Sequence, residues 1–301
     1  MGPRLALAPT RDLEREAGAL GLRIYTHHPT PYVTQLLTTM NRFVLSFLTL
    51  LLALPALAQD EPSQPIVVAS YHQCDWNGLG DLVTQDRERT LPIFQDMVDE
   101  GMIYSAGTGV HDYGDEWNMV TWHVADDMEA AMAATEEVAR RYNEAYPGDG
   151  LFLETCPKHR DVIYGAASWT TGGETPVVDE ENTHSMAISF YTCPFSALGK
   201  IKETYDRIQL PVAQALVDEG KLYDEGLYAH IYGDEWNVVL TRSAESFPAM
   251  LAASDEMDAR IADVVTEDDQ GFFQLGCTAH KDNIYTVVMA TTPRASDEDN
   301  E

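Results

Sequence analysis

The sequence predicts an α+β protein in which one βαββαβ unit occurs twice and both copies close into a single barrel. The first observation is an octapeptide at residues 111–118, HDYGDEWN, which returns at residues 230–237 as HIYGDEWN, with seven of eight positions identical. The second is that residues 74–118 align without a gap with residues 193–237, with 19 identities in 45 positions. One folding unit is therefore present twice, at an offset of 119 residues.

The first copy contains every element of this unit in order. β-Branched and aromatic residues mark its strands, and apolar residues at helical spacing mark its helices. Gly101 stands where a helix cap belongs, and Asp126 or Asp127 can cap the second helix. A Gly-Asp pair between two strands is typical of a hairpin turn. The predicted elements are a strand at 66–71, a helix at 80–100 that Pro92 kinks or divides, strands at 102–110 and 117–124, a helix from 128 to about 142, and a strand opening at 161–165.

The second copy repeats this order, with Pro211 in the place of Pro92 and Gly220 in the place of Gly101. Residues 171–184, which have no apolar periodicity, are predicted to link repeat 1 (65–170) to repeat 2 (185–292), and residues 293–301 form an acidic tail. The predicted elements of the second copy are a strand at 186–191, a helix at 199–219, strands at 222–230 and 236–241, a helix from 246 to about 261, and a strand at 283–289.

A βαββαβ unit is the ferredoxin-like arrangement, in which two helices cover one face of a four-stranded antiparallel sheet. Two copies can close together and bury the other face. Residues 114–122 followed by 127–131, and 233–240 followed by 245–247, place a hairpin and a strand before a capped helix. In this pattern the chain resembles the dimeric α+β barrel superfamily, which includes antibiotic-biosynthesis monooxygenases, haem-degrading monooxygenases and small stress-responsive barrel proteins.

The resemblance implies the fold and does not transfer an activity, because one fold hosts many functions. Haem-degrading members use an Asn, a Trp and a His in the barrel pocket, and these residue types do not fall here at positions that match residue by residue. The chain has no nucleotide-binding loop, GxSxG, HExxH or CxxCH motif. The sequence therefore assigns no catalytic residue.

Composition and the N-terminal region indicate export and limit the partners. With 49 acidic and 19 basic residues the net charge is -30, which would repel nucleic acid and anionic membranes. Residues 40–58 combine one positive charge, a short apolar run and an A-x-A site, as in a secretory signal peptide. We expect a periplasmic or extracellular protein without a membrane anchor after cleavage, and interpret residues 1–39 as a non-native extension upstream of Met40.

Each copy contributes two cysteines, one after its first strand and one before its fourth strand. Those strands are antiparallel neighbours in the predicted sheet, so their adjoining ends lie side by side. An exported protein meets an oxidising compartment, where disulfides persist. We therefore predict disulfides Cys74–Cys156 and Cys193–Cys277. The alternative is zinc, because His159 and a matching His280 each follow a cysteine at ligand spacing, but further ligands would be needed and no metal site is predicted.

The repeated octapeptide supplies the candidate ligand-binding residues. If the copies face each other, its two histidines can be related by an internal twofold axis and form a paired site. Each histidine can equally bond its own hairpin, and each tryptophan can simply pack in the core. Asn is unfavourable in a strand, which favours a specific hydrogen bond for it. The candidates are His111, Trp117, Asn118, His230, Trp236 and Asn237.

From these observations we expect an exported protein that binds a small ligand between its repeats. One alternative is a cofactor-poor monooxygenase or a haem-processing enzyme, and another is a structural or partner-binding envelope protein. No cofactor is predicted, although haem or a divalent metal stays open. Because both halves are supplied by one chain, a monomer or a weak dimer is expected. Asymmetry between the copies, such as Trp122-His123 against Thr241-Arg242, is a further mark of function.

Overall fold

The structure is a computed structural model that describes residues 64–114, 116–173, 177–179, 182–233, 235–266, 271 and 275–294. The chain divides into two compact units, Met1–Glu61 and Pro62–Glu301, and every described residue belongs to the second. The predicted N-terminal extension, the predicted signal peptide and residues 295–301 of the acidic tail lie outside the described residues. The predicted domain boundaries stay predictions.

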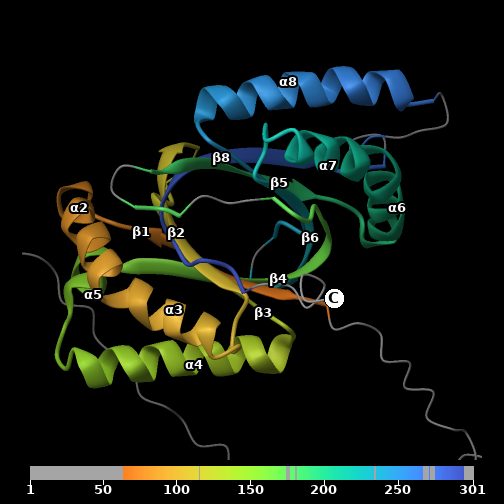
Figure 1. Ribbon diagram of the computed structural model, residues 1–301. Helices are drawn as coiled ribbons and strands as arrows, with labels where there is room; N and C mark the ends of the chain where they lie inside the picture. Colours follow the sequence, from red (N-terminus) through yellow and green to blue (C-terminus); the bar gives the residue numbers. More distant parts are fainter. Residues whose placement is uncertain are drawn as a thin grey trace, which may run out of the picture. The chain divides into compact units, whose positions relative to one another are not determined.

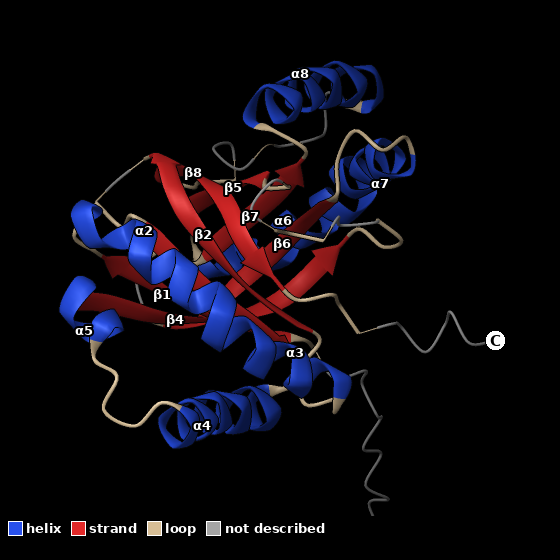
Figure 2. Cartoon of the chain, turned by 60° about the vertical axis from the view of Figure 1, so that its left-hand side comes forward, coloured by secondary structure: helices blue, strands red, loops and turns tan. Residues whose placement is uncertain are grey.

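In the described part of the chain, eight strands form one closed antiparallel barrel in the order β1-β3-β2-β8-β5-β7-β6-β4 (Figure 2). Each copy contributes four consecutive strands in the ferredoxin-like order, so the predicted fold class is confirmed. The strands are β1 (Ile66–Gln73), β2 (Ser105–Tyr113), β3 (Met119–Ala125), β4 (Lys158–Trp169), β5 (His184–Thr192), β6 (Asp224–Tyr232), β7 (Val238–Ala244) and β8 (Ala279–Ala290).

The two copies join edge to edge. β2 of the first copy pairs with β8 of the second, and β4 pairs with β6. Both seams contain register shifts, for example between Thr108 and Gly109 on β2 and between Ala166 and Ser168 on β4. Such bulges bend a strand and help a sheet to close. None of the described strands keeps an unpaired edge that another chain could extend.

The helices of each copy lie outside its own strands (Figure 1). All four predicted helices are present, each first helix being divided into segments, and the short helix α5 was not predicted. The first copy has α2 (Trp76–Gln85), the π-helical turn η1 (Asp86–Thr90), α3 (Leu91–Asp99), α4 (Met128–Ala145) and α5 (Leu151–Thr155). The second has the 3₁₀ turn η2 (Phe195–Ala197), α6 (Leu198–Thr204), the π-helical turn η3 (Tyr205–Gln209), α7 (Leu210–Asp218) and α8 (Phe247–Val264).

Proline explains where the first helix of each copy changes its winding. Pro92 and Pro211 stand in the first turn of α3 and α7, directly after the π-helical turns. Proline has no N–H to donate, and its ring clashes with the carbonyl of the preceding turn. The wider π turn accommodates that ring without ending the helix. The predicted kink at Pro92 is therefore realised as a local change of hydrogen bonding.

The helix ends follow the signals in the sequence. Gly101 has φ +77°, and its N–H donates to the Val98 carbonyl at 2.9 Å while the N–H of Met102 donates to Met97 at 2.9 Å. This is the αL cap that glycine favours. At the start of α4 the Asp127 carboxylate accepts from the Ala130 N–H at 2.9 Å. Of the two predicted caps, Asp127 is therefore the one used.

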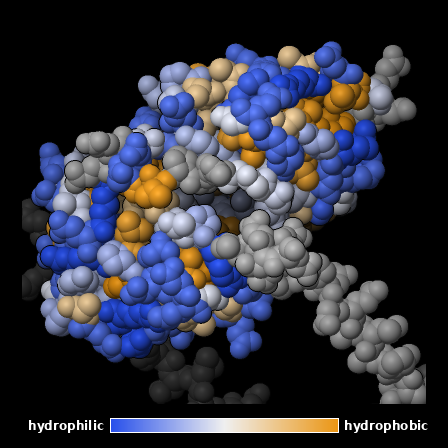
Figure 3. Space-filling view, viewed as in Figure 1, coloured by the Kyte–Doolittle hydropathy of each residue, from blue (hydrophilic) through white to orange (hydrophobic). Residues whose placement is uncertain are grey.

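The barrel interior is packed with aromatic and β-branched side chains from both copies. Tyr71, Phe190 and Tyr285 are fully buried there. A Cβ on Gly107 would lie 2.4 Å from the Trp122 ring, so glycine at this position leaves space for the indole. The outside is different: the face in Figure 3 is mostly hydrophilic, with separate small apolar groups.

Candidate functional site

The barrel has two distinct ends. Because all neighbouring strands are antiparallel, β1, β2, β5 and β6 finish at the end where β3, β4, β7 and β8 begin. Both hairpins and all four cysteines lie at that end, which we call the disulfide end. We call the opposite end, where β1, β2, β5 and β6 begin, the open end. The two copies of the repeated octapeptide therefore lie together at one end of the barrel.

At the disulfide end the structure joins the two predicted cysteine pairs. Cys74 is bonded to Cys156, 82 residues away, and Cys193 to Cys277, 84 residues away. In both copies the bond ties the residue just after the first strand to the residues that lead into the fourth strand. The described residues contain no free cysteine.

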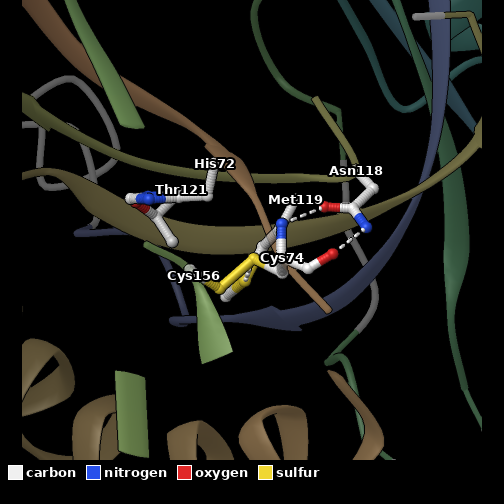
Figure 4. The surroundings of a disulfide bond; sticks show 6 residues. All are labelled: His72, Cys74, Asn118, Met119, Thr121 and Cys156. Carbon is white, nitrogen blue, oxygen red and sulfur yellow. Dashed lines mark hydrogen bonds between the residues drawn. A yellow bond between two sulfur atoms is a disulfide. The ribbon is translucent and has the colours of Figure 1, made fainter. Parts of the chain in front are cut away.

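The two motif asparagines hold the backbone beside these disulfides. The Asn118 side-chain oxygen accepts from the Cys74 N–H at 2.7 Å, and its Nδ2 donates to the Cys74 carbonyl at 2.8 Å (Figure 4). Asn237 makes the same two bonds to Cys193, at 2.7 and 2.6 Å. Each buried side-chain amide thus bonds the N–H and carbonyl of a cysteine at the point where no neighbouring strand is left to bond them. Neither asparagine lines either of the two cavities described below.

The motif tryptophans help to close the barrel interior at the same end. The Arg160 guanidinium carbon lies 5.2 Å from the Trp117 ring centroid and 5.3 Å from that of Tyr71. These are cation–π distances, at which ring and cation attract each other. The Tyr71 ring in turn meets that of Phe190 at 5.8 Å. In the second copy the matching residues are Lys281, Trp236 and Phe190, with Lys281 Nζ 5.5 and 5.2 Å from the two rings.

The motif histidines are not brought together. His111 on β2 and His230 on β6 are four positions apart in a closed order of eight strands, so they lie on opposite sides of the barrel. The His111 ring contacts Tyr285 at 5.6 Å between centroids, and the His230 ring lies 6.3 Å from Tyr164. Within the described residues no group of three or more His, Cys, Asp or Glu is arranged to hold a metal ion.

Inside the barrel, towards the open end, is a cavity of about 250 Å³ that we call the barrel cavity. Its polar side chains come chiefly from the second copy, and we call this group the polar wall: His184, Asp224, Tyr228, Thr241 and Ser243. The facing apolar wall comes largely from the first copy and includes Val67, Ala69, Val120, Trp122 and Val124. A largely apolar site with a few convergent polar groups is typical of small-molecule pockets.

His184 is the most informative residue of the polar wall. Its side chain is only 6% exposed, and its buried Nδ1 has no hydrogen-bond partner among the described residues. Burial lowers the pKa of this imidazole to about 4, so the ring is neutral near pH 7. His184 therefore contributes a neutral, buried imidazole to the lining of the barrel cavity.

Asp224 places a carboxyl group in the same wall. The Ser243 hydroxyl donates to it, and burial raises its pKa. Burial, and to a lesser degree the neighbouring Asp224, raises the pKa of Tyr228 to about 12. No Lys or Arg is among the described residues that line the barrel cavity. The wall therefore offers hydrogen bonds and one acidic group, without a Lys or Arg.

The sequence prediction missed these polar-wall residues because it searched where the two copies agree. At the offset of 119 residues, His184 corresponds to Pro65, Asp224 to Ser105 and Tyr228 to Gly109. Chemical differences between the copies were the available signal. That signal was noted for Trp122 against Thr241, both of which line the barrel cavity, but not for His184, Asp224 or Tyr228.

A larger cavity of about 550 Å³ lies outside the barrel, between the strands and helices of the second copy. Its charged groups are largely paired with one another. Arg242 contacts the buried Glu225 at 2.6 Å, and His280 lies 2.8 Å from the Asp282 carboxylate. The barrel cavity, in which an apolar wall is combined with polar groups that have no Lys or Arg beside them, is therefore the stronger candidate site.

The sequence matches no family model and no curated protein. Solved structures with the same fold are similar to this chain at low identity. One is a proposed monooxygenase from Lactobacillus acidophilus NCFM, with a TM-score of 0.52 at 11% identity over 76% of this chain and 96% of the other. Another is a proposed monooxygenase from Fusobacterium nucleatum subsp. nucleatum ATCC 25586, with a TM-score of 0.52 at 8% identity over 78% of this chain and 97% of the other.

These likenesses extend over both repeats and show the fold, which agrees with the predicted resemblance to α+β barrels. At such identities they do not carry an activity to this chain. As a separate finding, none of the helices in the described part of the chain combines the length and apolar character needed to cross a membrane.

Proposed function

We propose that the protein binds a small organic molecule in the barrel cavity. The observation that carries the proposal is the lining of this cavity of about 250 Å³, in which an apolar wall is combined with convergent polar groups that include His184, Asp224 and Tyr228. Pockets for drug-sized ligands occupy about 300–1,000 Å³, so the expected ligand is smaller than those. The six motif residues predicted as ligand contacts lie at the other end of the barrel and do not line this cavity.

The enzyme alternative is supported only by the shared fold of the two proposed monooxygenases. Haem does not fit the barrel cavity, because a tetrapyrrole is larger than the drug-sized molecules that already need about 300–1,000 Å³. No step through haem is therefore derived. A purely structural role in the cell envelope is the remaining alternative, and it predicts that the cavity holds no organic ligand.

We also propose export and a monomeric state. Two disulfides favour an oxidising compartment over the cytosol, and the predicted signal peptide is consistent with this. The closed barrel leaves no edge among the described strands for a partner to extend, and a net charge of -30 disfavours self-association and nucleic acid.

The test is to fill the barrel cavity from its rim. Ser105, half-buried on β2, lines it, whereas Ser196 is exposed on η2. We expect Ser105→Trp to abolish binding of small aromatic molecules, measured by native mass spectrometry and thermal shift, and Ser196→Trp to retain it. Equal binding by both variants would place the ligand elsewhere. Absence of binding by the unaltered protein across a broad library would favour the structural role.

A further inference from the structure

We propose that the barrel cavity selects a small organic ammonium ion, an inference that rests on the proposed ligand-binding function. The observations behind it are the aromatic lining, the acidic group in the polar wall, and the charge of the surroundings. Each of them distinguishes a cation from a neutral or anionic molecule of the same size.

Four aromatic side chains line the barrel cavity: Tyr71, Trp122, Tyr164 and Tyr228. The face of an aromatic ring carries negative potential and attracts ammonium groups, and Trp does so most strongly. Aromatic cages are a recurrent way to bind alkylammonium ions, because they hold the cation without requiring a second charge of opposite sign at hydrogen-bond distance. A ligand among these rings gains from a positive charge as well as from apolar contact.

Asp224 adds the opposite charge. Its carboxyl group accepts from the Ser243 hydroxyl, and no salt bridge joins it to a Lys, Arg or His within the described residues. A partly buried carboxylate without a cation is unfavourable, and such a group is usually paired. An ammonium ion in the barrel cavity provides that pairing.

The same features disfavour an anion. The described lining has no Lys or Arg, and Arg160 and Lys281 lie over the aromatic rings at the disulfide end. The whole chain carries a net charge of -30, which raises the local concentration of cations and lowers that of anions. Selectivity is therefore expected in the order ammonium, neutral alcohol, carboxylate.

Binding should weaken as the pH falls. Burial raises the pKa of Asp224, so acidification neutralises the carboxylate that pairs with the ligand. His184, with a pKa of about 4, adds a repelling positive charge only at lower pH. The other titratable groups that line the cavity are tyrosines, and Glu225 lies next to Asp224 in the sequence on the outer face of β6.

The experiment compares three molecules of equal size: benzylammonium, benzyl alcohol and benzoate. Calorimetry on the mature full chain at pH 7 should give affinity in that order. Asp224→Asn should reduce the affinity for benzylammonium about tenfold and leave that for benzyl alcohol nearly unchanged. The matched control is Asp81→Asn, at an exposed position on α2, which should change neither.

If Asp224→Asn does not fold, Asp224→Ser serves instead, because serine occupies the corresponding position 105 of the first copy. Binding of benzyl alcohol as tightly as benzylammonium would overturn the charge selectivity while leaving the proposed ligand site intact. Failure of all three molecules to bind the unaltered protein would overturn the ammonium proposal. Loss of binding in Ser105→Trp tests the site independently.

Discussion

The two ends of the barrel are built from the same duplicated unit and have diverged to different extents. At the disulfide end the copies agree nearly residue for residue: Asn118 and Asn237 make the same pair of backbone bonds, next to equivalent disulfides. At the open end they differ, because His184 and Asp224 of the second copy stand where the first has Pro65 and Ser105.

This difference separates frame from site. In each copy a disulfide and an asparagine hold the end of the first strand in place. Because this structural requirement is the same in both copies, the same residue types occur in both. A small ligand inside the barrel meets both copies at once, and an unsymmetrical molecule needs an unsymmetrical lining. Repetition within this chain therefore marks residues that hold the fold together, and departures from repetition mark the candidate site.

The largest expected effect is at the disulfide end. Replacing Cys74 and Cys156 by serine should lower the free energy of unfolding by about 2–5 kcal/mol, because it frees a closed loop of 82 residues in the unfolded chain. Chemical denaturation measures this loss. Replacing Cys193 and Cys277 should have a similar effect, since their separation is 84 residues. Markedly unequal losses of unfolding free energy would show that the two disulfides do not stabilise their copies equally.

A smaller loss is expected from the motif asparagines. Asn118→Ala removes two buried hydrogen bonds and leaves the N–H and carbonyl of Cys74 without these partners, which should lower the free energy of unfolding by about 2–3 kcal/mol. Asn237→Ala should do the same through Cys193. The control is Asn77→Ala, because Asn77 is exposed and its side chain bonds Asp75, which is also exposed.

Ligand affinity in both asparagine variants, measured below their melting temperatures, should stay within about twofold of the unaltered protein. A selective loss of binding with stability unchanged would return these residues to the ligand site and remove the contrast between the two ends.

The smallest effect is pH-dependent and involves one histidine from each end. Burial lowers the pKa of His72 and of His184 from 6.5 to about 4, so the unfolded chain binds more protons than the folded protein between these values. Stability is therefore complete above pH 6.5 and falls as the pH drops towards 4. Each histidine should account for about 2 kcal/mol of the loss between pH 7 and 5.

Melting curves of His184→Gln and His72→Gln at pH 7 and pH 5 measure separately how much each histidine contributes to the loss of stability. Saturation with a neutral ligand should reduce the loss of stability that protonation of His184 causes at low pH, because the ligand binds beside the neutral imidazole at the open end. The loss that His72 causes should not change. Equal protection of both histidines, or of neither, would contradict a ligand contact specific to His184.

Much of the frame could be predicted from local patterns. The β-branched and aromatic content of the strands, Gly101 and Gly220 at helix ends, and the acid before α4 are local signals, and the structure contains each of these features. The helix α5 was missed because five residues are too short for periodicity to show. The π-helical turns before Pro92 and Pro211 were foreseen only as kinks, since the way in which backbone bonds rearrange around a proline depends on the packing of the flanking segments.

The candidate site was predictable only in part. The repeated octapeptide drew the prediction to His111, Trp117, Asn118 and their counterparts, and repetition alone does not separate a structural from a binding role. His184 stands in no motif, and it lies at the first residue of a strand. Its burial and its unpartnered nitrogen follow from the residues that surround it in the closed barrel.

By itself the sequence determined the duplication, the order of strands and helices, and the cysteine pairs, because these depend on periodicity and on neighbours within one βαββαβ unit. Only the tertiary structure decided which side chains of the two copies face each other. That depends on the seams β2–β8 and β4–β6, where bulges near Gly109 and Ala166 shift the register. A shift of one residue exchanges inward and outward faces, so the barrel cavity and its polar wall exist only once both seams have closed.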